Sequence, residues 1–134
     1  MSLLAIVPRL IDLIQQVVLN YRSIRDIDQI CEKMKGVVQG CRLTQVVAMT
    51  VLESLSVAQT GGLNDAVRLL ESQVLNAEYE IAKLVGKNKA VLYITGQQVR
   101  QLLLDTLEEL RSCAVQFFIA AISARRLLRG QQRP

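Results

Sequence analysis

The most constraining feature of this sequence is the spacing of its apolar residues, which recur every three or four positions along nearly the whole chain. This spacing gathers apolar side chains on one side of an α-helix, whereas a half-buried strand requires strict alternation of apolar and polar residues. No long stretch of the sequence alternates in that way. The sequence therefore predicts an all-α protein in which each helix carries one apolar stripe.

The first predicted helix ends near Asn20. Its stripe is formed by Leu3, Val7, Leu10, Ile14, Val17 and Tyr21, and is widened by Ile6, Leu13 and Val18. Ser23 and Asp26 have the spacing of a capping box, in which two side chains satisfy free backbone amides at the start of a helix. We therefore predict a second helix that begins at Ser23 and runs to about Leu55.

Glycines mark the positions where the helices are weakest. Gly36 and Gly40 each cost about 1 kcal/mol relative to Ala inside a helix, so they predict a kink or a close helix contact in the second helix. Residues 59–62, with the sequence QTGG, predict a loop, and Asn64 predicts the N-cap of a third helix.

The third predicted helix keeps its apolar period up to Gly86, a residue that readily adopts the left-handed conformation found after helix ends. The following stretch, KNKAVLYIT, predicts a connector with one or two helical turns, because Gly96 interrupts the pattern soon afterwards. We expect the last helix to fray around residues 128–130. Its predicted buried stripe consists of Val99, Leu103, Leu107, Leu110, Ala114, Phe117 and Ala121.

Four long amphipathic helices with short connections predict an up-and-down four-helix bundle, with a short extra helical connector before the last helix. The chain has 134 residues, of which 51% are hydrophobic, and this is enough to bury one core. No repeat and no second domain is apparent. We expect residues 1–134 to form a single domain.

The residue types argue against enzymatic chemistry. The sequence contains no His, which excludes His-dependent catalytic triads and imidazole zinc ligands. Neighbouring carboxylates point in different directions on a helix and favour solvated faces; the closest are Asp26 with Asp28, Glu78 with Glu80, and Glu108 with Glu109. Gly86 and Lys87 lack the other residues of a phosphate-binding loop. We expect no enzymatic activity, metal, cofactor or small-molecule substrate.

The number and spacing of the cysteines indicate a reducing compartment. Cys31, Cys41 and Cys113 are odd in number, and the first two would lie about 15 Å apart along a common helix, too far for a disulfide. We expect buried, unreactive thiols.

The longest uncharged run, residues 112–124, is shorter than the roughly 20 residues that a membrane span requires.

The basic excess of this chain, which has a net charge of +4, lies near its C-terminus. Arg125, Arg126 and Arg129 follow an apolar segment, an arrangement that suits acidic lipid headgroups or nucleic acid. Cations at a helix C-terminus also stabilise the helix dipole, so a purely structural role stays open. Aromatic residues make up only 4% of the chain, which argues against base stacking and hence against a nucleic-acid partner.

The first helix admits two interpretations. Its only charged residues are Arg9 and Asp12, which share one narrow polar line with Gln16. A helix of about 20 residues is about 30 Å long, the thickness of the bilayer hydrocarbon. Copies of the helix could associate in a membrane with this line facing a lumen. Alternatively, the helix packs in the bundle and exposes the line to water.

The order of an apolar first helix, a long second helix and two later segments resembles a known family. The segment LNDAVRLLESQVLNAEYEIAKLVGKNKAVLYI and the closing QQVRQLLLDTLEELRSCAVQF are similar to HeLo-type four-helix bundles. This group includes the killer domain of mixed-lineage kinase domain-like pseudokinases, fungal HeLo domains, and the helper-type coiled-coil domain of plant NLR immune receptors. The similarity covers most of the chain and lies in its hydrophobic pattern.

The resemblance implies a cell-death or innate-immune signalling domain, of the kind used in plant defence. Such a domain is cytoplasmic, moves to the plasma membrane on activation, self-associates into oligomers and permeabilises the membrane. It is commonly the N-terminal signalling domain of a larger protein.

The resemblance also implies roles for particular residues. The membrane-active first helix would use Leu3, Leu4, Ile6, Val7, Arg9, Leu10, Asp12 and Gln16. Anionic membrane lipids would contact Lys33, Lys35, Arg42, Lys87 and Lys89, with Arg125, Arg126 and Arg129 as further candidates from the charge distribution. An alternative remains open, in which the protein is a soluble helical adaptor that binds partner helices in a groove between its own.

Overall fold

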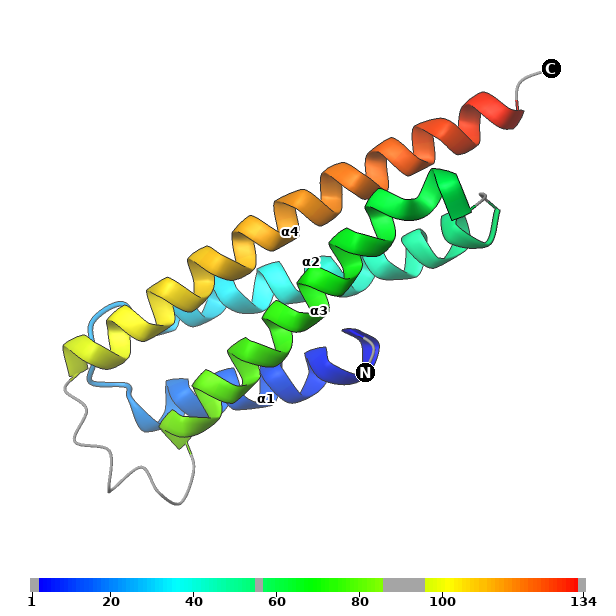
Figure 1. Cartoon of the computed structure of the whole chain (residues 1–134). Helices are drawn as coiled ribbons and strands as arrows, with labels where there is room; N and C mark the ends of the chain where they lie inside the picture. The colour runs from blue at the N-terminus through cyan, green and yellow to red at the C-terminus, as the bar shows by residue number, and fades with distance from the viewer. Residues whose placement is uncertain (1–2, 55–56, 86–95, 133–134) are drawn as a thin grey trace.

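The structure, a computed structural model, describes residues 3–54, 57–85 and 96–132. These residues form four α-helices: α1 (Leu3–Asn20), α2 (Ile27–Ser54), α3 (Val57–Val85) and α4 (Gly96–Gln132). The described ranges contain no strand, so the predicted all-α four-helix bundle is confirmed (Figure 1). The predicted helical connector before the last helix falls on residues 86–95, outside the described residues.

The four helices form a ring in which chain neighbours are not always spatial neighbours. α1 packs extensively against α2 and α3, and α4 packs against the same two helices. The order around the ring is therefore α1, α2, α4, α3, which places α2 and α3 at opposite corners (Figure 1). As a result, α4 forms one groove with α2 and another with α3.

Pairs of contacting residues give the direction of each helix. Arg9 contacts Glu78, and Tyr21 contacts Leu84, so residue numbers rise together and α1 runs parallel to α3. Between α2 and α4, one hollow is lined by Lys33 and Arg111 and the next by Leu43 and Ile122, so these two helices are also parallel. The bundle therefore combines parallel and antiparallel helix pairs.

The core lies where the predicted stripes meet. The largest wholly buried side chains include Ile6, Leu10, Met34, Leu70 and Phe117, so every helix contributes to a single apolar cluster. Burial of one such side chain stabilises a fold by about 1.5–3 kcal/mol. The stripes predicted for the first and last helices are confirmed for most of their residues, although Tyr21 and Ala121 are only partly buried and the side chain of Leu3 is outside the described part of the chain.

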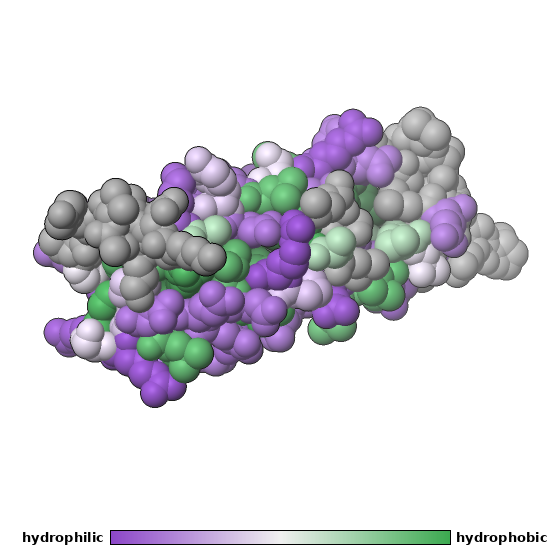
Figure 2. Space-filling model, turned by 90° about the horizontal axis from the view of Figure 1, so that it is seen from below, coloured by the Kyte–Doolittle hydropathy of each residue, from purple (hydrophilic) through white to green (hydrophobic). Residues whose placement is uncertain are grey.

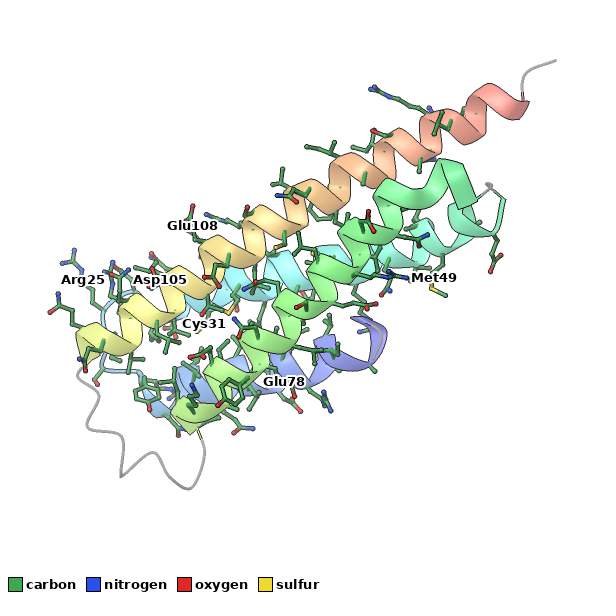
Figure 3. The ribbon with its side chains drawn as sticks, viewed as in Figure 1. Arg25, Cys31, Met49, Glu78, Asp105 and Glu108 are labelled. Carbon is green, nitrogen blue, oxygen red and sulfur yellow. The ribbon has the colours of Figure 1, made fainter. Side chains whose placement is uncertain are left out.

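α1 covers only part of the bundle. It has 18 residues, whereas α2 has 28, α3 has 29 and α4 has 37. At 1.5 Å per residue, α4 is about 28 Å longer than α1. The C-terminal half of α2 and the C-terminal half of α4 therefore extend beyond the N-terminal end of α1 (Figure 1). Met49, which is 47% exposed, lies on α2 in this uncovered part (Figure 3).

The predicted start of the second helix is wrong by about one turn. Asp26 has a φ of 64°, a left-handed conformation that Asp tolerates but that cannot continue a right-handed helix. The amide of Ile30 donates a hydrogen bond of 3.0 Å to the carbonyl of Asp26. α2 therefore begins at Ile27, and the predicted capping box of Ser23 and Asp26 does not form its start.

Two other predicted interruptions are also wrong. The predicted loop at residues 59–62 lies inside α3, because α2 ends at Ser54 and α3 already begins at Val57. Tertiary packing overrides the glycine propensity here, because Leu63 directly after this segment is buried. Likewise, α4 continues through residues 128–130, where we expected fraying, and ends at Gln132.

The two glycines of α2 have different surroundings. A Cβ atom added at Gly40 would lie 3.8 Å from Cζ of Phe118 on α4, so this glycine marks the predicted close helix contact. A Cβ atom added at Gly36 would meet no atom within 4 Å. α2 remains one continuous helix through both residues. Gly36 therefore leaves open space beside α2.

Candidate interaction surface

The residues of α1 predicted to act in a membrane lie on two sides of the helix. Its apolar members are wholly buried in the bundle: Ile6, Val7 and Leu10. Its polar members are exposed: Arg9, Asp12 and Gln16. Leu3 and Leu4 begin the helix, and their side chains are outside the described part of the chain. The exposed polar line agrees with the interpretation of α1 as a bundle helix.

Polar contacts hold α1 against α3. Nη2 of Arg9 lies 3.0 Å from Oε2 of Glu78, which projects from α3 toward α1 (Figure 3). The hydroxyl of Tyr21 donates a hydrogen bond of 2.6 Å to the carbonyl of Leu84 at the other end of the pair. A partly exposed ion pair contributes about 0–1 kcal/mol. Apolar burial therefore provides most of the attachment of α1.

The face of the molecule below α1 offers no large apolar area. In the view from below, hydrophilic residues are interspersed with small separate apolar areas (Figure 2). Single exposed apolar residues are normal on a soluble surface. Among the described residues, no helix is both long enough and apolar enough to cross a membrane.

The predicted lipid-binding cations are spread over several parts of the bundle. Lys33 on α2 and Arg125 on α4 line the hollows between these two helices. Lys35 is mostly buried and forms an ion pair of 2.9 Å with Glu32. The others on described helices are exposed: Arg42, Arg126 and Arg129. Lys87 and Lys89 lie outside the described residues.

The hollows between α2 and α4 are lined mainly by apolar residues. Two hollows, of about 500 and 370 Å³, share Gly40 and Phe118 and so join into one groove. We call this the α2/α4 groove. It is lined by Lys33, Gly36, Val37, Gly40, Leu43, Thr44 and Val47 of α2, and by Arg111, Ala114, Val115, Phe118, Ala121, Ile122 and Arg125 of α4.

Large apolar side chains stand exposed along both edges of this groove. Leu43 and Val47 on α2 are 71% and 50% exposed, and Val115 and Ile122 on α4 are each 54% exposed. Ile119 lies one turn from Val115 on α4 and is 60% exposed. A contiguous apolar patch of this kind marks an interaction site on a soluble protein.

Sequence reasoning missed this second apolar stripe. Leu43 and Val47 are four positions apart on α2, and Val115, Ile119 and Ile122 have the same helical spacing on α4. Each exposed stripe lies beside the core stripe of its helix, so the sequence pattern alone does not separate the two. The presence of a second apolar stripe on one helix is the signal that indicates an exposed apolar surface.

The groove between α3 and α4 has the opposite character. It has a volume of about 500 Å³ and is lined by Asn76, Glu80, Gln98, Gln101, Leu102, Asp105, Thr106 and Glu109. We call this the α3/α4 groove. Its polar groups bond to one another: Nε2 of Gln73, on the neighbouring turn of α3, donates to Glu109 at 2.7 Å, and Nε2 of Gln101 donates to Asp105 at 2.9 Å.

Nothing in the described part of the chain assembles a reactive centre. Burial raises the pKa of the Cys31 and Cys41 thiols to about 11, so these thiols stay protonated and unreactive at neutral pH. Both are buried, as predicted, whereas Cys113 is only partly buried. The described residues contain no group of His, Cys, Asp or Glu side chains that could hold a metal ion.

Comparisons with protein-family models, with curated proteins and with solved structures found no match.

Proposed function

We propose that this protein is a non-enzymatic interaction module that binds an amphipathic helix of a partner protein in its α2/α4 groove. The observation that carries the proposal is an apolar groove between two parallel helices, with exposed Leu43, Val47, Val115 and Ile122 along its edges. An amphipathic helix placed in such a groove buries its apolar side against the groove and keeps its polar side in water.

The size of the apolar contact is consistent with reversible binding. Complete burial of a Val, Leu or Ile side chain contributes about 1.5–3 kcal/mol, and the four edge residues are each at least half exposed. Their burial would provide about 3–7 kcal/mol before the entropic cost of association is subtracted. The expected dissociation constant is micromolar or weaker, as in many signalling contacts.

A direct test uses a fluorescent, uncharged amphipathic peptide of about 18 residues, with Leu on one face and Gln on the other. The anisotropy of this peptide should rise with protein concentration. Leu43→Asn should abolish the rise, because this side chain stands at the groove edge and is 71% exposed. The matched control is Leu69→Asn on α3, a similarly exposed residue outside the groove. Equal binding by both variants and the wild type contradicts the proposal.

A second candidate function is permeabilisation of the plasma membrane by self-associated copies of α1, in a cell-death or innate-immune pathway. Its support is the division of α1 into a wholly apolar side and a narrow exposed line of Arg9, Asp12 and Gln16. In this mechanism α1 leaves the bundle and the polar line faces a lumen. The protein would then be cytoplasmic until it reached anionic lipids of the plasma membrane.

Dye release from vesicles that contain acidic lipids tests the second candidate. Deletion of residues 1–21 should abolish release if α1 is the permeabilising element. Asp12→Leu should change channel conductance more than fold stability, because Asp12 is exposed in the bundle. Release that persists after the deletion, or conductance that Asp12→Leu leaves unchanged, excludes this role of α1.

A further inference from the structure

Positive charge marks both ends of the α2/α4 groove. Lys33 of α2 and Arg111 of α4 line one end, and Arg125 lines the other. Arg111 and Arg125 are fourteen residues apart on α4. At 1.5 Å per residue, this separation is about 21 Å, or about four helical turns. The surface between the charges is apolar, as the exposed Val115 and Ile122 show.

These three cations have no ion-pair partner within residues 3–54, 57–85 and 96–132. Some other cations of the bundle do have one, such as Arg9 with Glu78 and Lys83 with Glu80. Among the described residues that line the groove there is also no Asp or Glu. The side chains that line the groove therefore carry positive charge only, and this charge favours an acidic ligand.

The floor of the groove admits a closely packed helix. Gly36 has no neighbouring atom within 4 Å of the position where a Cβ atom would lie. At this position α2 therefore presents backbone rather than a side chain to the groove, whereas Gly40, one turn later, faces Phe118 of α4. Absence of a side chain lets the backbone of a docked segment come near.

We infer, on the basis of the helix-binding role proposed above, that the partner helix is acidic, with a carboxylate at each end of an apolar stripe four turns long. One carboxylate meets Lys33 and Arg111, and the other meets Arg125. Apolar side chains at positions i, i+4, i+7 and i+11 of the partner lie between them. A guanidinium binds a carboxylate through two parallel hydrogen bonds, so the two arginines also fix the register of the partner along the groove.

Three peptides of about 18 residues test this inference. They share the Leu face of the uncharged peptide above and differ only at the two positions fourteen residues apart, which are Glu, Gln or Lys. In low salt, the Glu peptide should bind about tenfold more tightly than the Gln peptide, and the Lys peptide more weakly than either. The advantage of Glu over Gln should shrink as salt is added.

Charge-removing variants locate the effect. Arg111→Gln with Arg125→Gln should remove most of the advantage of the Glu peptide over the Gln peptide, with Lys33 retaining the remainder, while the Gln peptide binds as before. The control is Arg22→Gln with Arg68→Gln, which removes the same charge from exposed positions outside the groove. If the control pair weakens the Glu peptide as much as the groove pair does, net charge explains the result and the inference fails.

The outcomes separate the inference from the proposed function. Equal binding of the Glu and Gln peptides overturns the inference and leaves helix binding intact, whereas no binding of any peptide overturns both. Flotation with vesicles of phosphatidylserine and phosphatidylcholine tests lipid as the occupant, and sedimentation tests a second copy of the chain. Vesicle binding or dimerisation that Arg111→Gln with Arg125→Gln abolishes, without peptide binding, also overturns the inference.

Discussion

The two grooves that α4 forms differ in what they do with their polar groups. In the α3/α4 groove, Gln101 bonds to Asp105 and Gln73 bonds to Glu109, so the protein satisfies its own side chains. In the α2/α4 groove, the described residues offer Arg111 and Arg125 no ion-pair partner, and the edges are apolar. The comparison teaches that two grooves along one helix can differ in whether their polar side chains are paired within the protein.

The charge sequence of α4 produces this difference. Asp105, Glu108 and Glu109 lie in its first half, and only basic charges follow, from Arg111 onward. Asp105 and Glu108 project from the exposed side of the first half of α4, well away from the uncovered end of the bundle (Figure 3). One helix thus carries an acidic segment that is followed by a basic segment, and the basic segment adjoins the exposed Val115 and Ile122.

The largest expected effect comes from filling the α2/α4 groove. Gly36→Leu should weaken binding of the Glu peptide by more than tenfold, because the new side chain occupies open space at the groove floor. The free energy of unfolding should rise by up to about 1 kcal/mol, since Leu favours a helix over Gly. Fluorescence anisotropy and urea denaturation measure the two effects.

Gly62→Leu is the matched control for this variant. Gly62 is exposed in α3 and also has no atom within 4 Å of an added Cβ, but it is not among the residues lining the groove. It should gain similar stability and keep full binding. A Gly36→Leu protein that binds the peptide as well as Gly62→Leu contradicts the location of the site.

Charge reversal should give the next largest effect. Arg111→Glu with Arg125→Glu should invert the preference, so that the Lys peptide binds about tenfold more tightly than the Glu peptide. The comparison is a reversal of two charges in the α3/α4 groove, Asp105→Lys with Glu109→Lys, which should leave the order of the peptides unchanged. An inversion caused by the second pair would show that the two grooves are not distinct.

A smaller effect concerns how the free energy of unfolding depends on pH through the buried Cys31 thiol. The pKa of Cys31 is raised from 9.0 to about 11 by burial, so the folded protein favours the protonated thiol. This contribution is fully present below pH 9 and is lost as the pH rises toward 11, because the unfolded chain ionises first. At pH 10 the loss should be about 1 kcal/mol per thiol. The difference between pH 8 and pH 10 in urea denaturation should narrow in Cys31→Ala; an unchanged difference would falsify the assignment.

The smallest expected effect is on the α3/α4 groove itself. Gln101→Ala removes an exposed hydrogen bond to Asp105, so the free energy of unfolding should fall by no more than about 0.5 kcal/mol. Peptide binding should not change. Calorimetry and anisotropy on the same sample check both statements, and a clear loss of binding would extend the contact surface to this side of α4.

Much of the fold was predictable, because the apolar period alone determines which side of each helix is buried. Ile14, Leu103 and Leu110 were assigned to the core from their spacing, and all three are wholly buried. The break at residues 59–62 was predicted wrongly because glycine content reports local propensity, whereas packing of Leu63 and its neighbours decides where α3 begins.

The candidate site was harder to predict from the sequence. Lys33 and Arg111 are 78 residues apart, and only the ring order of the helices brings them to one end of a groove. Periodicity gives the buried side of a helix but not the identity of its neighbours. Had α2 packed beside α3 instead of α4, the same charges would have lain on separate faces.

The parallel course of α2 and α4 gives any docked helix a preferred polarity. The peptide dipoles of both walls point the same way, with partial negative charge toward the C-terminal ends where Arg125 lies. A third dipole beside them is lowest in energy when it opposes both. The N-terminus of an incoming helix would therefore face Arg125 and its C-terminus would face Lys33, so a partner sequence and its reversal are not equivalent.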